Sequence, residues 1–415
     1  MVTLKTDFSE YTPAYNPIEA VLSSDKTSED SFRYIFDLVF LGGETIRFKV
    51  NPEPITGNNF GIKDFHKIVE SKVKAFINKS PELSPFGMTQ MDGSLIQYHV
   101  EYGEEYLYNG VITENPEDPK LIGSTKYSWE GSLKYNEFAD YTFSNYDIDV
   151  NGDFLTDSFT NYISRNNLGY SGVLTSNPSD VEFLQIKTYD VNNVLIDTYR
   201  AANPTNPISY GTRFLNIHTG TYNLNQIAVL SLGSQPIIDN TVFRYTLTLT
   251  DAGFNDLTSE LEFIIKEQCN YPLTRLLFEN RYGAFDSFSF DLVRRDSINI
   301  EKKSFKFTPN RLTGSGSLIY SKSDRTNVNY NIKSSTQIEL NANWITEEQS
   351  KWLEDLFTSP EIYIENTEGG KGNKTLISVA EIQSNIYPIK TQKADGLFNV
   401  DLVLTLSNNN YRQRK

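Results

Sequence analysis

The sequence predicts a mainly β, multidomain protein, with antiparallel β-sandwiches or barrels, one amphipathic helix in each terminal domain and an immunoglobulin-like middle domain. Three observations lead to this prediction. The chain has 415 residues, enough for two to three domains of about 150 residues each. Aromatic residues make up 13% of it, whereas disordered chains contain few. Short runs of alternating apolar and polar residues recur along the chain and end at Gly, Asn or Pro, as strands do.

The N-terminal part begins without periodicity. Residues 1–30 are polar, with scattered Tyr and Pro, and we expect them to form an extended arm. In residues 32–40 and 46–50, apolar side chains recur at every second position, which is the spacing of a strand. Gly42-Gly43 provides a turn between the two runs, because glycine readily adopts positive φ. These runs therefore predict a β-hairpin.

The rest of the N-terminal domain, residues 31–176, contains a predicted helix and further strands. Near residues 62–77, apolar side chains recur at spacings of three and four, and lysines fall largely on the opposite side. This pattern is typical of an amphipathic helix. Strand-like runs lie around residues 94–102 and 105–112, and Asn109-Gly110 marks a turn. The stretch that follows is polar and irregular, so it predicts no regular element.

The middle domain is predicted over residues 177–268. Two strands, residues 181–189 and 194–199, flank Asn192-Asn193. A second pair covers residues 242–250 and 259–266. Short strands at this spacing suit an antiparallel sandwich of about ninety residues, close to the size of an immunoglobulin-like domain.

The C-terminal domain, residues 269–415, is predicted to be β-rich with one helix near residues 347–358. Thr346 and Gln349 form a capping box before an apolar face that contains Trp352 and Leu356. Alternation predicts strands before the helix and after it. These strands cover residues 274–279, 285–293, 304–307, 316–321, 328–333, 336–342, 361–365, 376–379 and 400–406.

The charge and the cysteine count exclude several classes of protein. There are 38 basic and 53 acidic residues, for a net charge of −15, so the chain as a whole is a poor non-specific binder of DNA or anionic lipid. One cysteine excludes a disulfide framework and thiolate zinc fingers. We expect no targeting signal at the N-terminus, and the sequence has no run of about 20 apolar residues. We expect the chain to be made in the cytoplasm and to leave only as part of something larger.

One segment resembles a calcium-binding loop. Asp147-Ile-Asp149-Val-Asn151-Gly152-Asp153 has oxygen ligands at alternate positions and glycine at the sixth. The twelfth position, where such a loop needs a bidentate acid, is Ser158, and no helical pattern flanks the segment. An acidic turn between strands is therefore the favoured interpretation, with calcium binding as the alternative.

Other motifs favour structural interpretations. Gly369–Thr375 has the wrong glycine spacing for a phosphate loop and joins two strands, so an exposed hairpin loop is predicted. Gly314–Ser317 is followed by Leu318 and is not a nucleophile elbow, so a turn is predicted. Three aromatics around the capped helix have two interpretations. Their position favours core packing, and a sugar-stacking platform is the alternative. These aromatics are Trp344, Trp352 and Phe357.

Isolated nucleophilic and basic side chains predict no active site. His66, His99 and His218 have no second ligand nearby in sequence, which favours surface or loop histidines. Cys269 has no histidine nearby, which favours a buried or linker thiol. A pair of carboxylates at catalytic distance can exist in the fold, but no local pattern indicates one. We therefore predict no catalytic, cofactor-binding or metal-binding residues, no cofactor and no enzymatic activity.

Segments near both ends of the chain carry a resemblance to a known family. The first runs from Phe32 to Val50 and continues through Asn51-Pro-Glu-Pro54 and Gly61–Phe65. The others lie in the second half and comprise Cys269 with Arg275–Asn280 and Gly283–Phe288, Trp344–Tyr363, Tyr387 with Phe398–Leu402, and Asn408 with Arg412–Arg414. The stretches over which these segments are spread make up about half the chain. The segments resemble structural proteins of tailed bacteriophages of Bacteroidota, crAss-like phages included. The chain departs from the usual forms at Ala284, where they have Gly, and at Glu279, where they have Leu.

The resemblance implies a virion structural protein of the tail, neck or connector. Such a protein forms a homo-oligomeric ring around the DNA exit channel and contacts copies of itself and neighbouring virion proteins, and it acts by assembly rather than by chemistry. We expect it in the virion, with no membrane contact, no specific nucleic-acid binding and DNA passing through an acidic lumen. The alternative is a receptor- or carbohydrate-binding β-sandwich protein of the phage fibre or adhesion apparatus.

Overall fold

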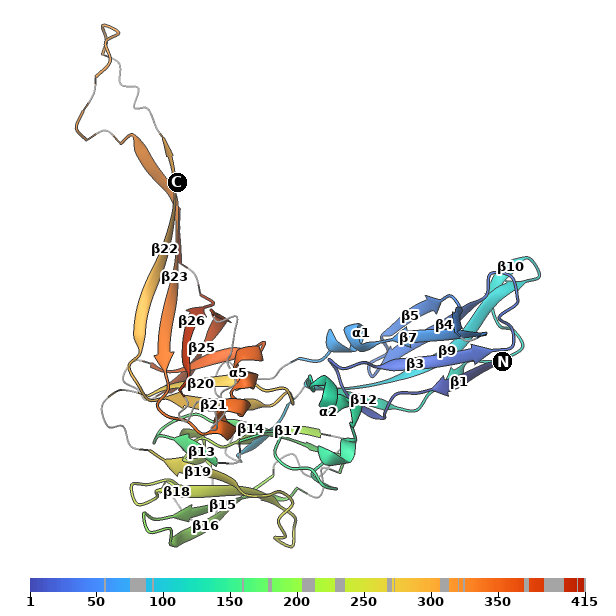
Figure 1. Ribbon diagram of the computed structural model, residues 1–415, viewed down its shortest axis with the longest axis horizontal. Helices are drawn as coiled ribbons and strands as arrows, with labels where there is room; N and C mark the ends of the chain where they lie inside the picture. The colour runs from blue at the N-terminus through green and yellow to red at the C-terminus, as the bar shows by residue number, and fades with distance from the viewer. Residues whose placement is uncertain are drawn as a thin grey trace. The chain divides into compact units, whose positions relative to one another are not determined.

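A computed structural model describes most of the chain. The described residues are 1–55, 57–74, 87–91, 93–158, 160–177, 181–203, 213–227, 236–266, 271, 273–306, 313–319, 321–323, 325–368, 373–383, 399–408 and 410–413. They form mainly β-structure, with several antiparallel sheets and few, short helices (Figure 1). This confirms the predicted fold class.

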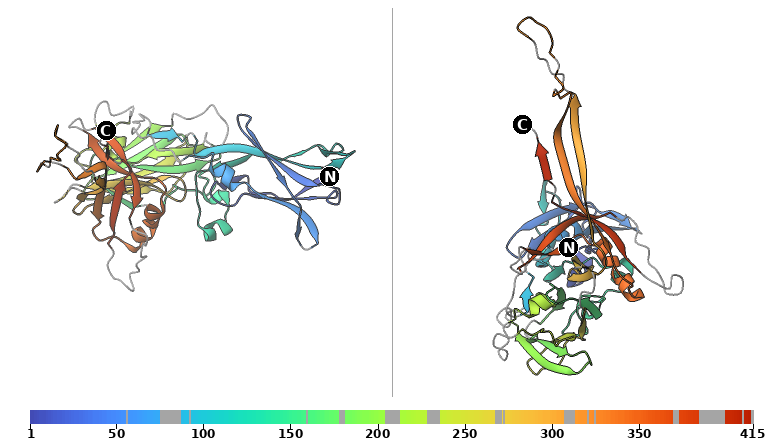
Figure 2. Two further views of the ribbon diagram at one scale, coloured as in Figure 1. Left: turned by 90° about the horizontal axis from the view of Figure 1, so that it is seen from above. Right: turned by 90° about the vertical axis from the view of Figure 1, so that its left-hand side faces the viewer.

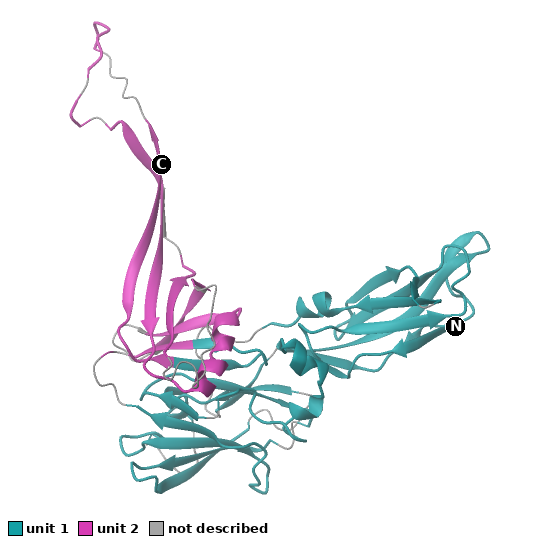
Figure 3. Cartoon of the chain, in the orientation of Figure 1, with its two compact units in different colours: residues 1–267, 277–288 teal, residues 268–276, 289–415 magenta. Residues whose placement is uncertain are grey.

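The chain divides into two compact units. Unit 1 comprises residues 1–267 and 277–288, and unit 2 comprises residues 268–276 and 289–415 (Figure 3). The predicted arm, N-terminal domain and middle domain all belong to unit 1. The predicted C-terminal domain matches unit 2 except for residues 277–288, so the chain passes between units within β20 (Thr274–Glu279) and β21 (Phe285–Phe290).

The predicted N-terminal arm is wrong, because residues 1–30 are part of two sheets. β1 (Val2–Thr6) and β3 (Glu19–Ser24) lie in a four-stranded sheet of order β1-β3-β7-β6, with β6 (Glu53–Ile55) and β7 (Asn58–Asp64). β2 (Tyr11–Pro13) pairs in parallel with β12 (Lys126–Trp129). The apolar side chains among these polar residues are fully buried, and their burial holds the segment in place. They are Ala14, Ile18, Ala20 and Leu22.

The predicted hairpin of residues 32–50 is confirmed. β4 (Arg33–Phe40) and β5 (Thr45–Val50) pair antiparallel in a seven-stranded sheet of order β2-β12-β9-β4-β5. Gly42 and Gly43 have φ of 112° and 90°, so the turn between the strands needs glycine. The apolar face of the hairpin packs into a core with β3, the α1 region and β9, in which Tyr34, Phe36 and Leu38 are fully buried.

The prediction of two separate strands around residues 94–102 and 105–112 is wrong. One long strand, β9 (Leu95–Tyr108), continues through Gly103 because its ladder with β4 is unbroken there. β10 (Val111–Glu114) and β11 (Leu121–Ile122) both pair with β9. Asn109 and Gly110, with φ of 51° and 82°, form the predicted turn.

The predicted helix near residues 62–77 is much shorter in the structure. Residues 62–64 belong to strand β7, because Ile62 pairs with Val21 in the ladder with β3. The helix α1 covers only His66–Glu70, and residues 75–77 lie outside the described part of the chain. Phe65, Val69 and Val73 are nevertheless buried, as the apolar spacing requires.

The middle sandwich is larger than the predicted domain of residues 177–268. Its five-stranded sheet has the order β13-β19-β18-β15-β16, and its three-stranded sheet has the order β14-β17-β8. Both sheets supply one apolar core. The strands are β8 (Met88–Gln90), β13 (Thr160–Ile163), β14 (Tyr170–Thr175), β15 (Phe183–Tyr189), β16 (Leu195–Ala202), β17 (Arg213–His218), β18 (Arg244–Thr250) and β19 (Leu261–Ile265).

The boundary at residue 177 is therefore wrong. β8, β13 and β14 all come before it, and their apolar side chains, including Met88 and Val173, share the core of the later strands. The antiparallel pairs β15–β16 and β18–β19 are confirmed. Three short helical segments lie in the irregular parts of unit 1. They are α2 (Tyr135–Ala139), the 3₁₀ helix η1 (Phe143–Asn145) and α3 (Thr221–Leu224).

Unit 2 is organised around an eight-stranded sheet of order β21-β20-β24-β25-β26-β23-β22, in which β27 also pairs with β23. Its other strands are β22 (Arg295–Lys306), β23 (Asn327–Asn341), β24 (Ile362–Glu368), β25 (Asn373–Ile382), β26 (Asp401–Leu406) and β27 (Asn410–Gln413). The predicted pairing of residues 361–365 with 376–379 is confirmed, since Glu365 faces Leu376. The last predicted strand is β26.

The predicted C-terminal helix and its capping box are confirmed, although the helix is divided into α4 (Glu347–Trp352) and α5 (Glu354–Thr358). The Gln349 amide donates to Thr346 Oγ1 over 3.1 Å, and the Thr346 amide donates to Gln349 Oε1 over 3.1 Å. Trp352, Leu353 and Leu356 of the helix pair are buried.

Replacing Thr346 by Ala is expected to lower the free energy of unfolding of unit 2 by about 1 kcal/mol, because the Gln349 amide loses its acceptor. Thr346→Ser keeps the hydroxyl oxygen, and its free energy of unfolding is expected to fall much less. Urea denaturation followed by circular dichroism measures both variants. Equal stability of Thr346→Ala and the unchanged protein would show that the cap contributes nothing.

Candidate assembly interface

A long β-hairpin forms one edge of the sheet of unit 2. We call β22 and β23 together the hairpin arm. β22 pairs only with β23 among the described strands, so its other edge is open. Figure 2 shows the two strands running on together beyond the remaining strands of unit 2. An open edge exposes a row of backbone donors and acceptors to which another strand can pair.

The open strand is exposed on both faces. All twelve residues of β22 are exposed to solvent, among them three large apolar side chains. Ile298 is 65% exposed, Ile300 is 53% exposed and Phe305 is 46% exposed. The residues opposite the two isoleucines on β23 are Thr336 and Ser334, which are too small to cover them. β26 and β27 pair with β23 at residues 337–341 and 331–334, so a ribbon of only two described strands remains at residues 304–306 and 327–329. Such a ribbon is at best marginally stable in water, so further contacts are expected to complete it.

The hairpin arm is basic, whereas unit 1 is acidic. The two strands of the arm, residues 295–306 and 327–341, contain five basic and three acidic side chains. Unit 1 contains 20 basic and 38 acidic residues, for a net charge of −18. Arg294 and Arg295 pair with Asp296 and Glu339. Lys302, Lys303 and Lys306 make no ion pair with a described residue, so their charges are available to a partner.

The strands predicted in this region are wrong in their length. Residues 304–306 belong to β22, which begins nine residues earlier, and the predicted strands at 328–333 and 336–342 merge into β23. Residues 316–319 are not a strand. The signal for the long hairpin is present in the sequence, because no Gly or Pro interrupts 295–306 and isoleucines occupy alternate positions. The many polar residues conceal it, since the strand buries neither face.

Gly314–Ser317 forms the predicted turn. The Gly316 amide donates to the Thr313 carbonyl over 2.9 Å, and Gly316 has a φ of 82°. In the Gly369–Thr375 segment, residues 369–372 lie outside the described part of the chain, and residues 373–375 are in β25 rather than in a loop.

The three histidines lie apart and differ in environment. His66 Nδ1 is 2.6 Å from Asp64 Oδ2, next to α1. His99 is half-buried in β9, and its Nε2 is 3.8 Å from Glu101. The predicted surface position of His218 is wrong, because it is buried at the end of β17 with its ring edge-on to Tyr170. Burial lowers the pKa of His218 to about 4, so this ring is neutral at physiological pH.

The three aromatics considered as a sugar platform do not share one environment. Trp352 is buried and belongs to the core, whereas Phe357 is half-buried and Trp344 is 62% exposed. Cys269 lies outside the described part of the chain.

Carboxylates on the outer side of β4 and β9 are paired with basic groups. Asp37 is buried and accepts two hydrogen bonds of 2.7 Å from Arg47 and one from Lys120. Burial opposes its ionisation, but these hydrogen bonds outweigh burial and lower the pKa of Asp37. Glu105 is paired with Lys49 at 2.7 Å. These ion pairs neutralise the buried carboxylates of Asp37 and Glu105.

The candidate calcium loop is an acidic turn that is hydrogen-bonded to the end of β14. The Asp147 carbonyl accepts from the amides of Val150, Asn151 and Gly152. A Cβ on Gly152 would lie 2.4 Å from the Asp147 carbonyl carbon, so the turn itself requires the glycine. Asp149 Oδ2 accepts from Thr175 Oγ1 at 2.7 Å and from the Asn177 amide at 2.6 Å. In the described part of the chain, no three His, Cys, Asp or Glu side chains come together as metal ligands do.

Asp149 gives this turn a testable pH dependence. Burial raises the pKa of Asp149 to about 6; hydrogen bonds from Asn177 and Thr175 oppose the rise, and the charge of Asp147 adds to it. Because the folded state binds the proton more tightly than the unfolded state, the protein loses stability as the pH rises from about 4 through about 6. Asp149→Asn is therefore expected to stabilise it by about 1 kcal/mol at pH 7.5, after allowance for partial exposure, and by nothing at about pH 4.

Thermal unfolding from pH 4 to pH 8 measures this effect. Asp153→Asn is the control, because Asp153 belongs to the same turn but accepts from Phe154 and Ser259. A lower melting temperature for Asp149→Asn at every pH would mean that the hydrogen bonds outweigh the charge. Addition of calcium is expected to change no melting temperature.

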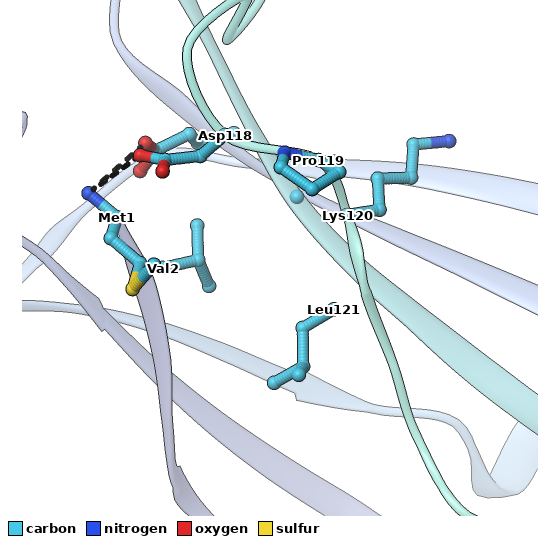
Figure 4. Close-up of a pocket in the computed structure, with 8 residues that line it drawn as sticks. Met1, Val2, Asp118, Pro119, Lys120 and Leu121 are labelled. Atoms are coloured by element: carbon cyan, nitrogen blue, oxygen red, sulfur yellow. Dashed lines mark ion pairs between the residues drawn. The ribbon is translucent and has the colours of Figure 1, made fainter.

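A small pocket lies at the first strand of unit 1 (Figure 4). Its volume is about 220 Å³, and Val2, Leu121 and the stem of Lys120 line part of it. The Met1 amino group is 3.3 Å from Asp118 and 3.7 Å from Glu104. Glu104 Oε1 also accepts from Asn115 at 2.6 Å. Groups of the chain itself thus occupy these carboxylates, and we assign no ligand to the pocket.

Comparison of the chain with protein-family models and with curated proteins found no match. None of the helices in the described part of the chain combines the length and the hydrophobicity that a membrane crossing requires. The hairpin arm is thus the feature of this molecule on which a functional argument rests.

Proposed function

We propose that the protein is a virion structural protein of a tailed phage. It is a subunit of a homo-oligomeric ring in the tail or neck, around the DNA exit channel. The observation that carries the proposal is the hairpin arm, whose open edge and exposed isoleucines require a partner. The resemblance of both ends of the chain to phage structural proteins supports the same role, which needs no catalytic residue and no cofactor.

The charge distribution supports a position beside DNA at which the protein does not bind the DNA. With a net charge of −18, unit 1 repels the phosphate backbone. A ring that lines its lumen with unit 1 lets DNA pass without sticking. A basic inner wall in an assembled ring would contradict this part of the proposal.

Mass spectrometry of purified phage particles tests the proposal. The expected result is a copy number equal to that of the portal protein, or a simple fraction of it, because neck and tail rings share the symmetry axis. Absence of the chain from the particles would overturn the structural role.

Exposed Trp344 favours a second candidate, a receptor- or carbohydrate-binding protein of the fibre apparatus. Glycan-array binding that is lost in Trp344→Ala, but not in Tyr135→Ala, would support this candidate. Tyr135 is the matched control because it is an exposed aromatic of unit 1.

A further inference from the structure

The hairpin arm needs a receiving surface, and unit 1 offers edge strands for one. A ring of identical copies arranged head to tail requires two different, complementary surfaces on each copy. This inference rests on the homo-oligomer of the proposed function and identifies its second surface. A strand that receives the arm needs an open edge, side chains that are exposed to solvent and a charge opposite to that of the arm.

β16 is the longest edge strand described in unit 1. It has eight residues and pairs only with β15 among the described strands. The six residues of β14 are all buried, and β5 has six residues. The other described edge strands of unit 1 are shorter still, so β16 provides the longest ladder for an added strand.

The tip of the β15–β16 hairpin exposes a cluster of apolar side chains. Four of the six residues from 191 to 196 are large, apolar and exposed, by 67%, 59%, 50% and 44% along the chain. They are Val191, Val194, Leu195 and Ile196. Single exposed apolar residues are normal on a protein surface, but a cluster of this kind marks an interaction site. Ile298 and Ile300 of the hairpin arm are apolar side chains of matching type.

Charge distinguishes β16 from β5, the other exposed edge strand of comparable length. β5 carries Arg47 and Lys49, and Lys63 lies over the ring of Phe48 in the same strand. Arg47 is paired with Asp37 and Glu114, and Lys49 is paired with Glu105, so these acids are already occupied and are not available to a basic partner. β16 carries exposed Asp197, which makes no ion pair with a described residue, and its Arg200 is stacked on Phe254 at 4.2 Å.

We propose that β22 of one copy adds parallel to the open edge of β16 in the next copy. With Lys302 opposite Asp197, Ile300 then lies opposite Leu195. Ile298 lies on the same face of the added strand, because residues two apart on a strand share a face, and it covers the apolar tip of the β15–β16 hairpin. Lys303 lies on the other face, at the same edge. Each copy both gives an arm and receives one, so the contact is head to tail and closes a ring when the rotation permits.

A charge exchange tests this contact. The wild-type chain is expected to form oligomers at low salt that dissociate as the salt concentration rises, measured by light scattering after gel filtration. Asp197→Lys and the double variant Lys302→Glu/Lys303→Glu are each expected to weaken association at least about tenfold, because like charges then face each other. The combination of all three changes is expected to restore association to within about threefold of wild type.

Asp140→Lys is the matched control, since Asp140 is an exposed acid of unit 1 at the end of α2. It is expected to assemble as wild type does. Circular dichroism and melting temperatures confirm that each variant is folded, since the changed side chains are exposed.

Several outcomes would overturn the proposal. Normal assembly of Asp197→Lys would exclude β16 as the receiving strand. Failure of the combined variant to recover association would exclude it as well. A chain that stays monomeric at every salt concentration would exclude the contact, even if mass spectrometry places the protein in particles and so upholds the proposed function. Retention of duplex DNA that requires Lys302 and Lys303, without any oligomer, would assign the arm to nucleic acid instead.

Discussion

Ile298→Asp combined with Ile300→Asp is expected to convert assembled protein to monomers. Both side chains are more than half exposed in the single chain, so the change leaves the fold of unit 2 intact. In an assembly they are covered, and burial of an isoleucine is worth about 1.5–3 kcal/mol. Loss of two therefore weakens association by about a hundredfold or more. Analytical ultracentrifugation over a range of concentrations measures the change.

Leu41→Asp combined with Val150→Asp is the matched control for this prediction. These two side chains are also exposed and apolar, by 77% and 58%, but they lie in turns of unit 1. The control is expected to assemble like wild type. If both double variants weakened assembly equally, general surface hydrophobicity rather than the hairpin arm would drive it.

Gly283→Ala is expected to abolish cooperative folding of unit 1. A Cβ at this position would lie 1.4 Å from the carbonyl oxygen of Glu130, and Gly283 has a φ of 81°. The backbone cannot move away easily, because Asn280 Oδ1 holds the amides of Tyr282 and Ala284. Relief of such an overlap costs more than about 4 kcal/mol, a large part of the stability of a domain.

Gly43→Ala separates the clash from the backbone strain. Gly43 also has positive φ, 90°, but nothing lies within 4 Å of a Cβ built there. Its expected cost is about 1–2 kcal/mol. Soluble yield and thermal unfolding measure both variants. A Gly283→Ala protein as stable as Gly43→Ala would show that the turn of residues 280–284 is free to shift.

Local patterns in the sequence predicted local structure well. The hairpin of residues 32–50, the Asn109-Gly110 turn and the Thr346 capping box are all confirmed. Each depends on residues within a few positions of one another, such as glycines that supply positive φ or a threonine and a glutamine spaced by three. The acidic turn at residues 147–153 also has a local cause, since Gly152 packs against the backbone of Asp147.

Predictions that depended on distant partners were wrong. Residues 1–30 look like an arm because Ile18, Ala20 and Leu22 are few among polar neighbours, yet they complete a core formed with β4 and β9. Ile62 fits a helical spacing, but its pairing with Val21 places it in a strand. His218 looks like a loop residue, and the sandwich buries it.

By itself, therefore, the sequence determined the fold class, the strands with clear alternation such as β4, β15 and β18, several turns and the acidic balance of the chain. These follow from side-chain periodicity, backbone preference and charge, which neighbouring residues express. Only the tertiary structure decided that strands before residue 177 complete the middle sandwich and that β22 lies open at a sheet edge. Both depend on which strands pair across long stretches of chain, and the burial of distant apolar side chains, which no local window contains, selects that pairing.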